Sequence, residues 1–328
     1  MHLLSASLRP LLIAPLFCAA LALVALPASA RTLAEVQALV DAKAAGASAA
    51  AEALTRESPN DANAWVMLVR ARLQAKQAEK AIAAGEKAVA LGPKNAQAHY
   101  WLGNAYGNRI GEVGMLSKMT MAPKLRDAFE QAVKLDPALI DARSSLIEFY
   151  LQAPGAIGGG VDKARAQAAA IGKYDRAKGL VAQARIAMYE KKPAEALKAY
   201  EGAYAMKPGD PQLRLALILG YQEAKRWKDA YTLAKQWTVD APKQAKPWYQ
   251  IGRIAAESGQ YLAEGEAALR AYLKLSRETG DPEPKHARYR LGQILAKAGR
   301  KDEARAELQA ALKIDPKFKE AKEALSTL

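Results

Sequence analysis

The chain of 328 residues contains a single cysteine, Cys18, which lies in an apolar stretch near the N-terminus. A single cysteine cannot form an intrachain disulfide. The sequence after residue 30 also has no thiol nucleophile and no sulfur ligand for zinc. Its stability therefore has to come from packing alone. Secreted eukaryotic domains more often carry disulfides, so this composition favours a bacterial protein.

Histidine is nearly as scarce, with three residues in the whole chain. His99 and His286 fall within helical patterns, where a packed histidine is more common than a catalytic one. The sequence contains no G-x-S-x-G, no H-E-x-x-H and no calcium-binding EF-hand loop. We therefore expect no enzyme activity, no cofactor and no metal.

Long hydrophobic runs are absent except for Leu11–Leu26. A short segment with one basic side chain, Arg9, precedes this run, and the small residues Ala28-Ser29-Ala30 follow it. This order predicts a cleaved secretory signal peptide over residues 1–30 and a periplasmic protein. An uncleaved anchor is one alternative, although the run is shorter than the roughly 20 residues that a spanning helix needs. Secretion to the medium is another alternative.

The rest of the chain repeats a helical pattern at about 34 residues. One bulky residue is followed at fixed offsets by an aliphatic residue, two alanines and a proline. Two copies with identical offsets are Trp65, Leu68, Ala81, Ala88, Pro93 and Arg288, Leu291, Ala304, Ala311, Pro316. Residues three and four apart share a helix face, so each copy predicts two short antiparallel helices closed by proline.

This pattern resembles the tetratricopeptide repeat, whose signature is W-x2-L-G-x2-Y, then A-x3-F, then P, at 34 residues. The resemblance implies an all-α fold, a right-handed α-solenoid of seven to eight stacked helix-turn-helix repeats. The glycines at Gly103, Gly252 and Gly292 occupy the small position of the signature, where helices must approach closely.

The repeat starts divide the chain after residue 30. Residues 31–61 are expected to form a degenerate helix pair that caps the array, and residues 319–328 a C-terminal capping helix with a polar outer face. The seven repeats between them are predicted at residues 62–95, 96–139, 140–176, 177–210, 211–244, 245–284 and 285–318.

Two consecutive repeats carry insertions, Gly107–Pro123 and Ala153–Gly160. The first is interpreted as a segment between the two helices of its repeat. Its Met115, Leu116 and Met119 are interpreted as an apolar helix face packed on the repeats. A Cu(I) site built from Met115, Met119 and Met121 is the alternative. In the second, the run of glycines is a flexible connector, or an anion site with Asp162 as the cap of the following helix.

In the family that the chain resembles, the first helices line a concave groove. The resemblance places inward side chains one, four and eight residues after each repeat start. The groove candidates taken from these positions are Asn63, Arg70, Tyr100, Asn104, Lys178, Arg185, Lys246, Tyr249, Arg253, His286 and Tyr289. Tyrosine offers rigid contact area and arginine pairs with carboxylates, so the set suits an extended peptide.

Charge supplies the second functional indication. The net charge is +14, and residues 151–300 hold 26 basic and 15 acidic side chains, a difference of +11. The leading hypothesis is a non-catalytic periplasmic scaffold that binds a protein segment, acidic in part, with Arg185, Lys246 and Arg253 as its cationic contacts. The alternative is an accessory protein that binds an anionic envelope polymer, acidic polysaccharide or lipopolysaccharide. An exported protein rarely meets nucleic acid, so none is expected, and the oligomeric state stays open.

Overall fold

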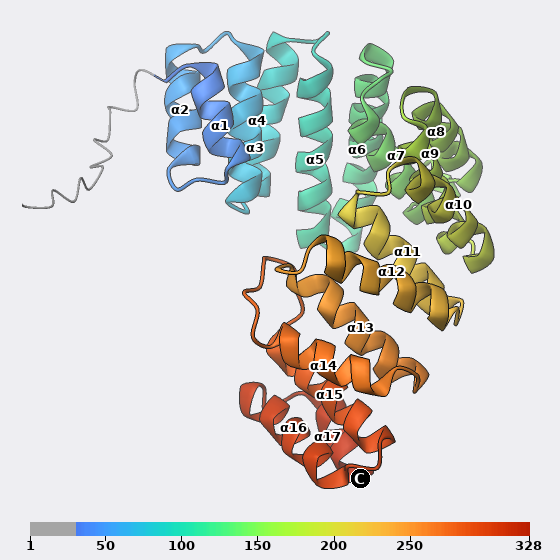
Figure 1. Ribbon diagram of the computed structural model, residues 1–328. Coiled ribbons are helices and arrows are strands. Elements are labelled where there is room, and N and C mark those ends of the chain that lie inside the picture. The colour runs from blue at the N-terminus through green and yellow to red at the C-terminus, as the bar shows by residue number, and fades with distance from the viewer. Residues whose placement is uncertain (1–30) are drawn as a thin grey trace, which may run out of the picture. The chain divides into compact units, whose positions relative to one another are not determined.

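The computed structural model describes residues 31–328, which form seventeen α-helices, one short 3-10 helix and no strand (Figure 1). The predicted all-α fold of stacked helix-turn-helix repeats is confirmed. The predicted signal peptide, residues 1–30, lies outside the described residues. Two compact units are present, one ending at Pro93 and the other running Lys94–Leu328.

The unit that ends at Pro93 contains two helix pairs. Their bounds are α1 Leu33–Asp41, α2 Ala47–Glu57, α3 Ala62–Gln74 and α4 Ala78–Leu91. Thr32 starts α1 with a capping box, in which its hydroxyl accepts from the Glu35 N–H and the Glu35 carboxylate accepts from the Thr32 N–H. Val36, Leu68 and Ala81 are fully or almost fully buried between these helices.

The second unit begins with two lengthened repeats. Their bounds are α5 Ala96–Glu112, α6 Met115–Leu135, α7 Ile140–Gln152, the 3-10 helix η2 Gly155–Ile157 and α8 Val161–Tyr174. The interpretation of Gly107–Pro123 as a segment between helices is wrong. These residues are helical and lengthen both α5 and α6, with only Val113 and Gly114 between the two helices.

Four regular pairs and a final helix follow. Their bounds are α9 Arg176–Tyr189, α10 Pro193–Met206, α11 Pro211–Glu223, α12 Trp227–Asp240, α13 Ala245–Ser258, α14 Leu262–Tyr272, α15 Pro284–Lys297, α16 Lys301–Ile314 and α17 Lys319–Ser326. Asp175 and Asp210 cap α9 and α11 with their carboxylates, which satisfies backbone N–H groups at the helix starts.

Close approach of paired helices explains the small positions of the repeat. A Cβ atom at Gly103 would lie 2.6 Å from the Phe129 ring, and one at Gly252 would lie 2.2 Å from Leu269. Both distances are below van der Waals contact, so the large residue of the second helix fills the space that glycine leaves. The expectation that glycine marks these crossings is confirmed.

Candidate functional site

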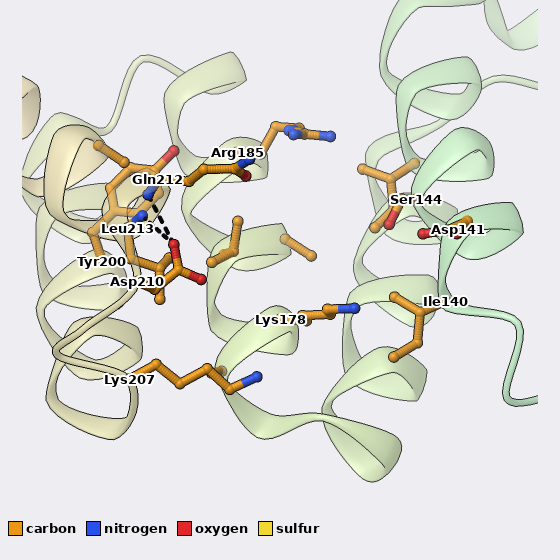
Figure 2. Close-up of a pocket in the computed structure, with 15 residues that line it drawn as sticks. Ile140, Asp141, Ser144, Lys178, Arg185, Tyr200, Lys207, Asp210, Gln212 and Leu213 are labelled. Atoms are coloured by element: carbon orange, nitrogen blue, oxygen red, sulfur yellow. Dashed lines mark hydrogen bonds between the residues drawn. The ribbon is translucent and has the colours of Figure 1, made fainter. Parts of the chain in front are cut away.

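Side chains from three consecutive first helices line one hollow of about 390 Å3, which we call the α7–α11 hollow (Figure 2). Helix α7 contributes Asp141 and Ser144, α9 contributes Lys178 and Arg185, and α11 contributes Gln212. Each of these residues lies one, four or eight residues after a repeat start, where the family resemblance places inward side chains. Stacking of equivalent helices thus brings residues about 35 apart in sequence to one surface.

Two cations of this hollow differ in their surroundings. The Arg185 guanidinium donates to the Glu148 carboxylate over 2.6 Å, and both side chains are about half exposed. Exposed pairs of this kind contribute about 0–1 kcal/mol, so an incoming carboxylate can compete with Glu148. The ammonium of Lys178 has no acidic partner within ion-pair distance in residues 31–328.

Two carboxylates beside the hollow, Asp175 and Asp210, are occupied, while Asp141 adds a third carboxylate to its lining. Asp175 accepts from the Lys207 ammonium over 2.7 Å and from the Lys178 N–H, and both interactions hold its pKa below the usual aspartate value. Asp210 accepts from the N–H groups of Gln212 and Leu213 at 2.8 and 3.1 Å. The hollow therefore keeps cationic capacity for a ligand while these carboxylates serve the helix starts.

Tyr200 of α10 forms an apolar wall of the hollow. Burial raises the pKa of its hydroxyl, which stays protonated and can donate a hydrogen bond. Tyr200 and Lys207 lie on or just after a second helix, so a scheme that counts only first-helix positions misses them. Tyr200 and Lys207 reach the hollow because helix α10 packs between the first helices α9 and α11.

A second hollow, of about 530 Å3, contains four of the predicted groove residues, Lys246, Tyr249, Arg253 and His286. The two cations are engaged within the chain. Lys246 lies 3.5 Å from the buried carboxylate of Asp281, and Arg253 donates to Glu257 over 2.9 Å. Glu257 also forms an ion pair with Arg290 at 3.1 Å. Both cations therefore stabilise the fold locally, so fewer charges face a ligand here than the sequence suggested.

The aromatic residues of this region belong to the core more than to a surface. Tyr249 is 8% exposed and packs on Tyr272 with 5.3 Å between ring centres. His286 and Tyr289 both pack edge-on against Phe318, at 5.1 and 5.5 Å. Tyr289 lines a separate hollow beside α17. The rings fill space between repeats, which limits the contact area that they can offer to a peptide.

The remaining candidates lie apart from the α7–α11 hollow or in the other unit. Tyr100 packs on Phe129, and the Asn104 side chain donates to the Tyr100 carbonyl over 2.9 Å. In the unit that ends at Pro93, Arg70 pairs with Asp41, and the Asn63 N–H donates to the Asp61 carboxylate. Of the eleven candidates, only Lys178 and Arg185 line the α7–α11 hollow.

The glycine connector does not present an anion site. The N–H groups of Gly158, Gly159 and Gly160 donate to the carbonyls of Gly155, Pro154 and Tyr150. Asp162, proposed as the cap of α8, instead accepts from Arg165 over 2.7 Å, and α8 has no side-chain cap. The glycines close a tight loop, in which a Cβ at position 159 would overlap the Ala153 carbonyl.

Within residues 31–328, no three histidine, cysteine, aspartate or glutamate side chains cluster as metal ligands would. No helix of the same range combines the length and the apolar character that crossing a bilayer requires.

Models of the tetratricopeptide repeat match residues 33–96, 187–254 and 249–317, which together are more than half of the chain. The chain belongs to the tetratricopeptide repeat family. Proteins of this family are generally non-catalytic scaffolds that bind protein partners. No curated protein sequence matches the chain.

Solved structures of similar fold include the Cut9–Hcn1 hetero-tetramer of the APC/C. That match is 16% identical, has a TM-score of 0.51 and covers 86% of this chain and 52% of the other. The chain thus spans about half the length of that protein. A tetratricopeptide repeat protein of Thermus thermophilus is 21% identical, with a TM-score of 0.48 and coverage of 58% and 95%. The pilF protein of Pseudomonas aeruginosa is 12% identical, with a TM-score of 0.48 and coverage of 81% and 97%.

Proposed function

We propose that the protein is a non-catalytic periplasmic scaffold that holds an extended protein segment in the α7–α11 hollow. An acidic side chain of that segment would meet Lys178 and Arg185. Residues 1–30 would direct export, and a role in envelope assembly or secretion would follow from that location. The observation that carries the proposal is the meeting of inner-face side chains from α7, α9 and α11 around the Lys178 ammonium, which has no carboxylate within ion-pair distance among residues 31–328.

The physical argument rests on competition for charge. A bound carboxylate gains Lys178 without breaking any ion pair, and it exchanges Arg185 from an exposed pair that contributes little. Tyr200 and the aliphatic Val181 and Leu213 supply contact area beside the cations. This combination of rigid apolar wall and sparse charge is typical of surfaces that recognise short extended segments.

The test is site-specific photo-crosslinking in intact cells, with a photoreactive amino acid in place of Ser144. We expect crosslinks to exported proteins that fall several-fold in the Lys178→Ala/Arg185→Ala variant, because a desolvated charge contact commonly contributes more than 1 kcal/mol. The matched control is Arg165→Ala/Lys192→Ala. It also removes two cations, from α8 and the start of α10, and neither lines the hollow.

Equal crosslinking by wild type and the Lys178/Arg185 variant would contradict the proposal. So would an equal loss in the control, since that would indicate a general effect of net charge.

The excess of cations in residues 151–300 favours one second candidate, an accessory protein that binds an anionic envelope polymer. Lys198, Lys228 and Lys243 are exposed cations of this stretch with no acidic partner within ion-pair distance in residues 31–328. Dispersed lysines of this kind suit a flexible polyanion, whereas the converging side chains of the α7–α11 hollow suit a peptide.

A further inference from the structure

The most exposed large apolar side chains among residues 31–328 include Met115, Leu116 and Met119, which are 74, 80 and 55% exposed. All three lie in the first turns of α6. The expectation that they pack on the repeats is therefore wrong. The inserted residues lengthen α5 and α6, and no element of residues 31–328 covers these three side chains.

Met115 and Met119 border a hollow of about 690 Å3 formed by α5, α6, α7 and η2, which we call the α5–α7 hollow. Its floor is part of the core, because Phe129 and Phe149 are buried and Leu125 and Ile157 pack against the same cluster. Met115 and Met119 form one rim. The hollow is thus an open groove with a rigid apolar floor and a flexible methionine edge.

Few charged side chains line this groove. Lys118 is the only lysine or arginine that lines it, and no acidic side chain of residues 31–328 lies within ion-pair distance of its ammonium. Glu148 is the only lining carboxylate, and Arg185 occupies it over 2.6 Å. The groove therefore presents one unneutralised positive charge beside an apolar floor.

We propose that the α5–α7 hollow binds an amphipathic helix of a partner protein. Its apolar side chains, spaced i, i+4 and i+7, would lie on Phe149 and Leu125 between Met115 and Met119, and an acidic residue beside them would meet Lys118. Unbranched methionine adapts to different apolar anchors, as grooves that accept helices require. A flat bilayer surface would cover Leu116 but would not reach the concave floor.

This site is separate from the α7–α11 hollow. Helix α7 stands between them, with Asp141 and Ser144 facing one and Ser145 and Phe149 facing the other. Arg185 of the first hollow and Glu148 of the second form one ion pair, which joins the two sites. The two proposals can still be told apart, because the Met115 and Met119 methyl signals report on α6 and a photoreactive group at position 144 reports on the α7–α11 hollow.

The experiment uses the full chain with 13C-labelled methionine methyl groups and two synthetic helices. The probe helix carries leucines at i, i+4 and i+7 with glutamates beside them, and the matched helix has lysines in place of the glutamates. We expect the probe to shift the Met115 and Met119 signals and to leave Met188 and Met206 unchanged. The latter two are 47 and 42% exposed and lie away from the hollow.

The matched lysine helix should bind about tenfold more weakly, because it places a cation against Lys118. Lys118→Glu should reverse this preference. Met115→Gln/Met119→Gln should weaken the probe by about tenfold, while Met188→Gln should leave its affinity unchanged. All of these positions are at least partly exposed, so helical content by circular dichroism should match wild type.

Three results would overturn the proposal. The first is no binding of the glutamate helix to wild type, or equal shifts at Met188 and Met206. The second is binding of anionic vesicles in place of the helix. The third is a concentration-dependent shift of Met115 and Met119 without any peptide, which would assign the groove to a second copy of the chain.

Discussion

At the scale of single residues, Gly172 and Gly179 mark a close approach of helices α8 and α9 that the repeat signature does not predict. A Cβ added to Gly179 would lie 2.5 Å from the Gly172 Cα and 2.8 Å from its nitrogen. Both atoms are backbone, so no side-chain rotation can relieve the overlap. The packing of α8 on α9 therefore depends on the absence of a side chain at this position.

Gly179→Ala should destabilise the fold by about 1–3 kcal/mol, because helices α8 and α9 would have to move apart. Gly111→Ala is the matched control, since a Cβ there meets nothing within 4 Å in helix α5. Alanine should stabilise that helix by about 0.5–1 kcal/mol. Urea unfolding followed by circular dichroism measures both, and a Gly179→Ala variant as stable as the control would show that the helices tolerate separation.

Sequence reasoning found two cations of the α7–α11 hollow, Lys178 and Arg185, but misjudged the surroundings of several other candidates. The inner-face rule identified Lys178 and Arg185 because position within a repeat depends only on local periodicity. It could not show that Asp281 lies 3.5 Å from Lys246 or that Tyr249 is buried on Tyr272. Those outcomes depend on side-chain directions and on packing between repeats.

At the scale of elements, the junction of α8 and α9 consists of one residue, Asp175, which ends one helix and caps the next. The third repeat lacks the closing proline of the others, and the aspartate supplies the turn. Its carboxylate accepts from the Lys178 N–H at 3.0 Å and from Lys207 at 2.7 Å. One side chain thus fixes a helix start and connects two repeats.

The lowered pKa of Asp175 predicts an acid dependence of stability. A group whose folded pKa lies below its unfolded value stabilises the fold above the unfolded pKa, and this contribution is lost as the pH falls through the folded pKa. Stability should therefore fall as the pH drops below about 4, the unfolded aspartate value. Asp175→Asn keeps a capping side chain but does not titrate, so its midpoint temperature should fall less steeply between pH 5 and 3.

Two further variants check this assignment. Asp175→Ala also removes the cap and should cost about 1 kcal/mol at neutral pH. Asp162→Asn serves as the control, because that carboxylate is almost fully exposed and caps no helix. Identical acid profiles of wild type and Asp175→Asn would refute the role given to this carboxylate.

At the scale of the whole molecule, the net charge of +14 is spread over a chain in which many arginines are paired. Arg214, Arg226 and Arg300, for example, each contact at least one carboxylate within 2.8 Å. Paired arginines add little to the field at a distance, so the positive field comes mainly from exposed lysines. Binding of an anionic envelope polymer, the second candidate function, would therefore depend mainly on these exposed lysines.

If an anionic polymer is the ligand, the full chain should be retained on an immobilised acidic polysaccharide above the physiological ionic strength of about 0.15 M. Lys198→Glu/Lys228→Glu/Lys243→Glu should move elution to lower salt. The measurement is the salt concentration at half elution, and an unchanged value for this variant would exclude the stretch 151–300 as the binding surface.

The control for that experiment carries the same charge change outside the stretch. Lys80→Glu/Lys87→Glu/Lys94→Glu alters three other exposed lysines by the same total charge. An equal shift in both variants would mean that retention follows net charge alone.

The sequence by itself determined the repeat, the helix pairs and the small residues at helix crossings, because all of these follow from a period that neighbouring residues define. Only the tertiary structure decided which charged side chains are paired within the chain and which remain available to a ligand. Arg185 and its partner Glu148 are 37 residues apart, and Lys207 and Asp175 are 32 apart. It also decided that Met115 and Met119 are exposed. The N–H groups of Gly158, Gly159 and Gly160 donate to backbone carbonyls, which only the tertiary structure shows. Each of these depends on which surfaces meet when helices stack, and no local pattern encodes that.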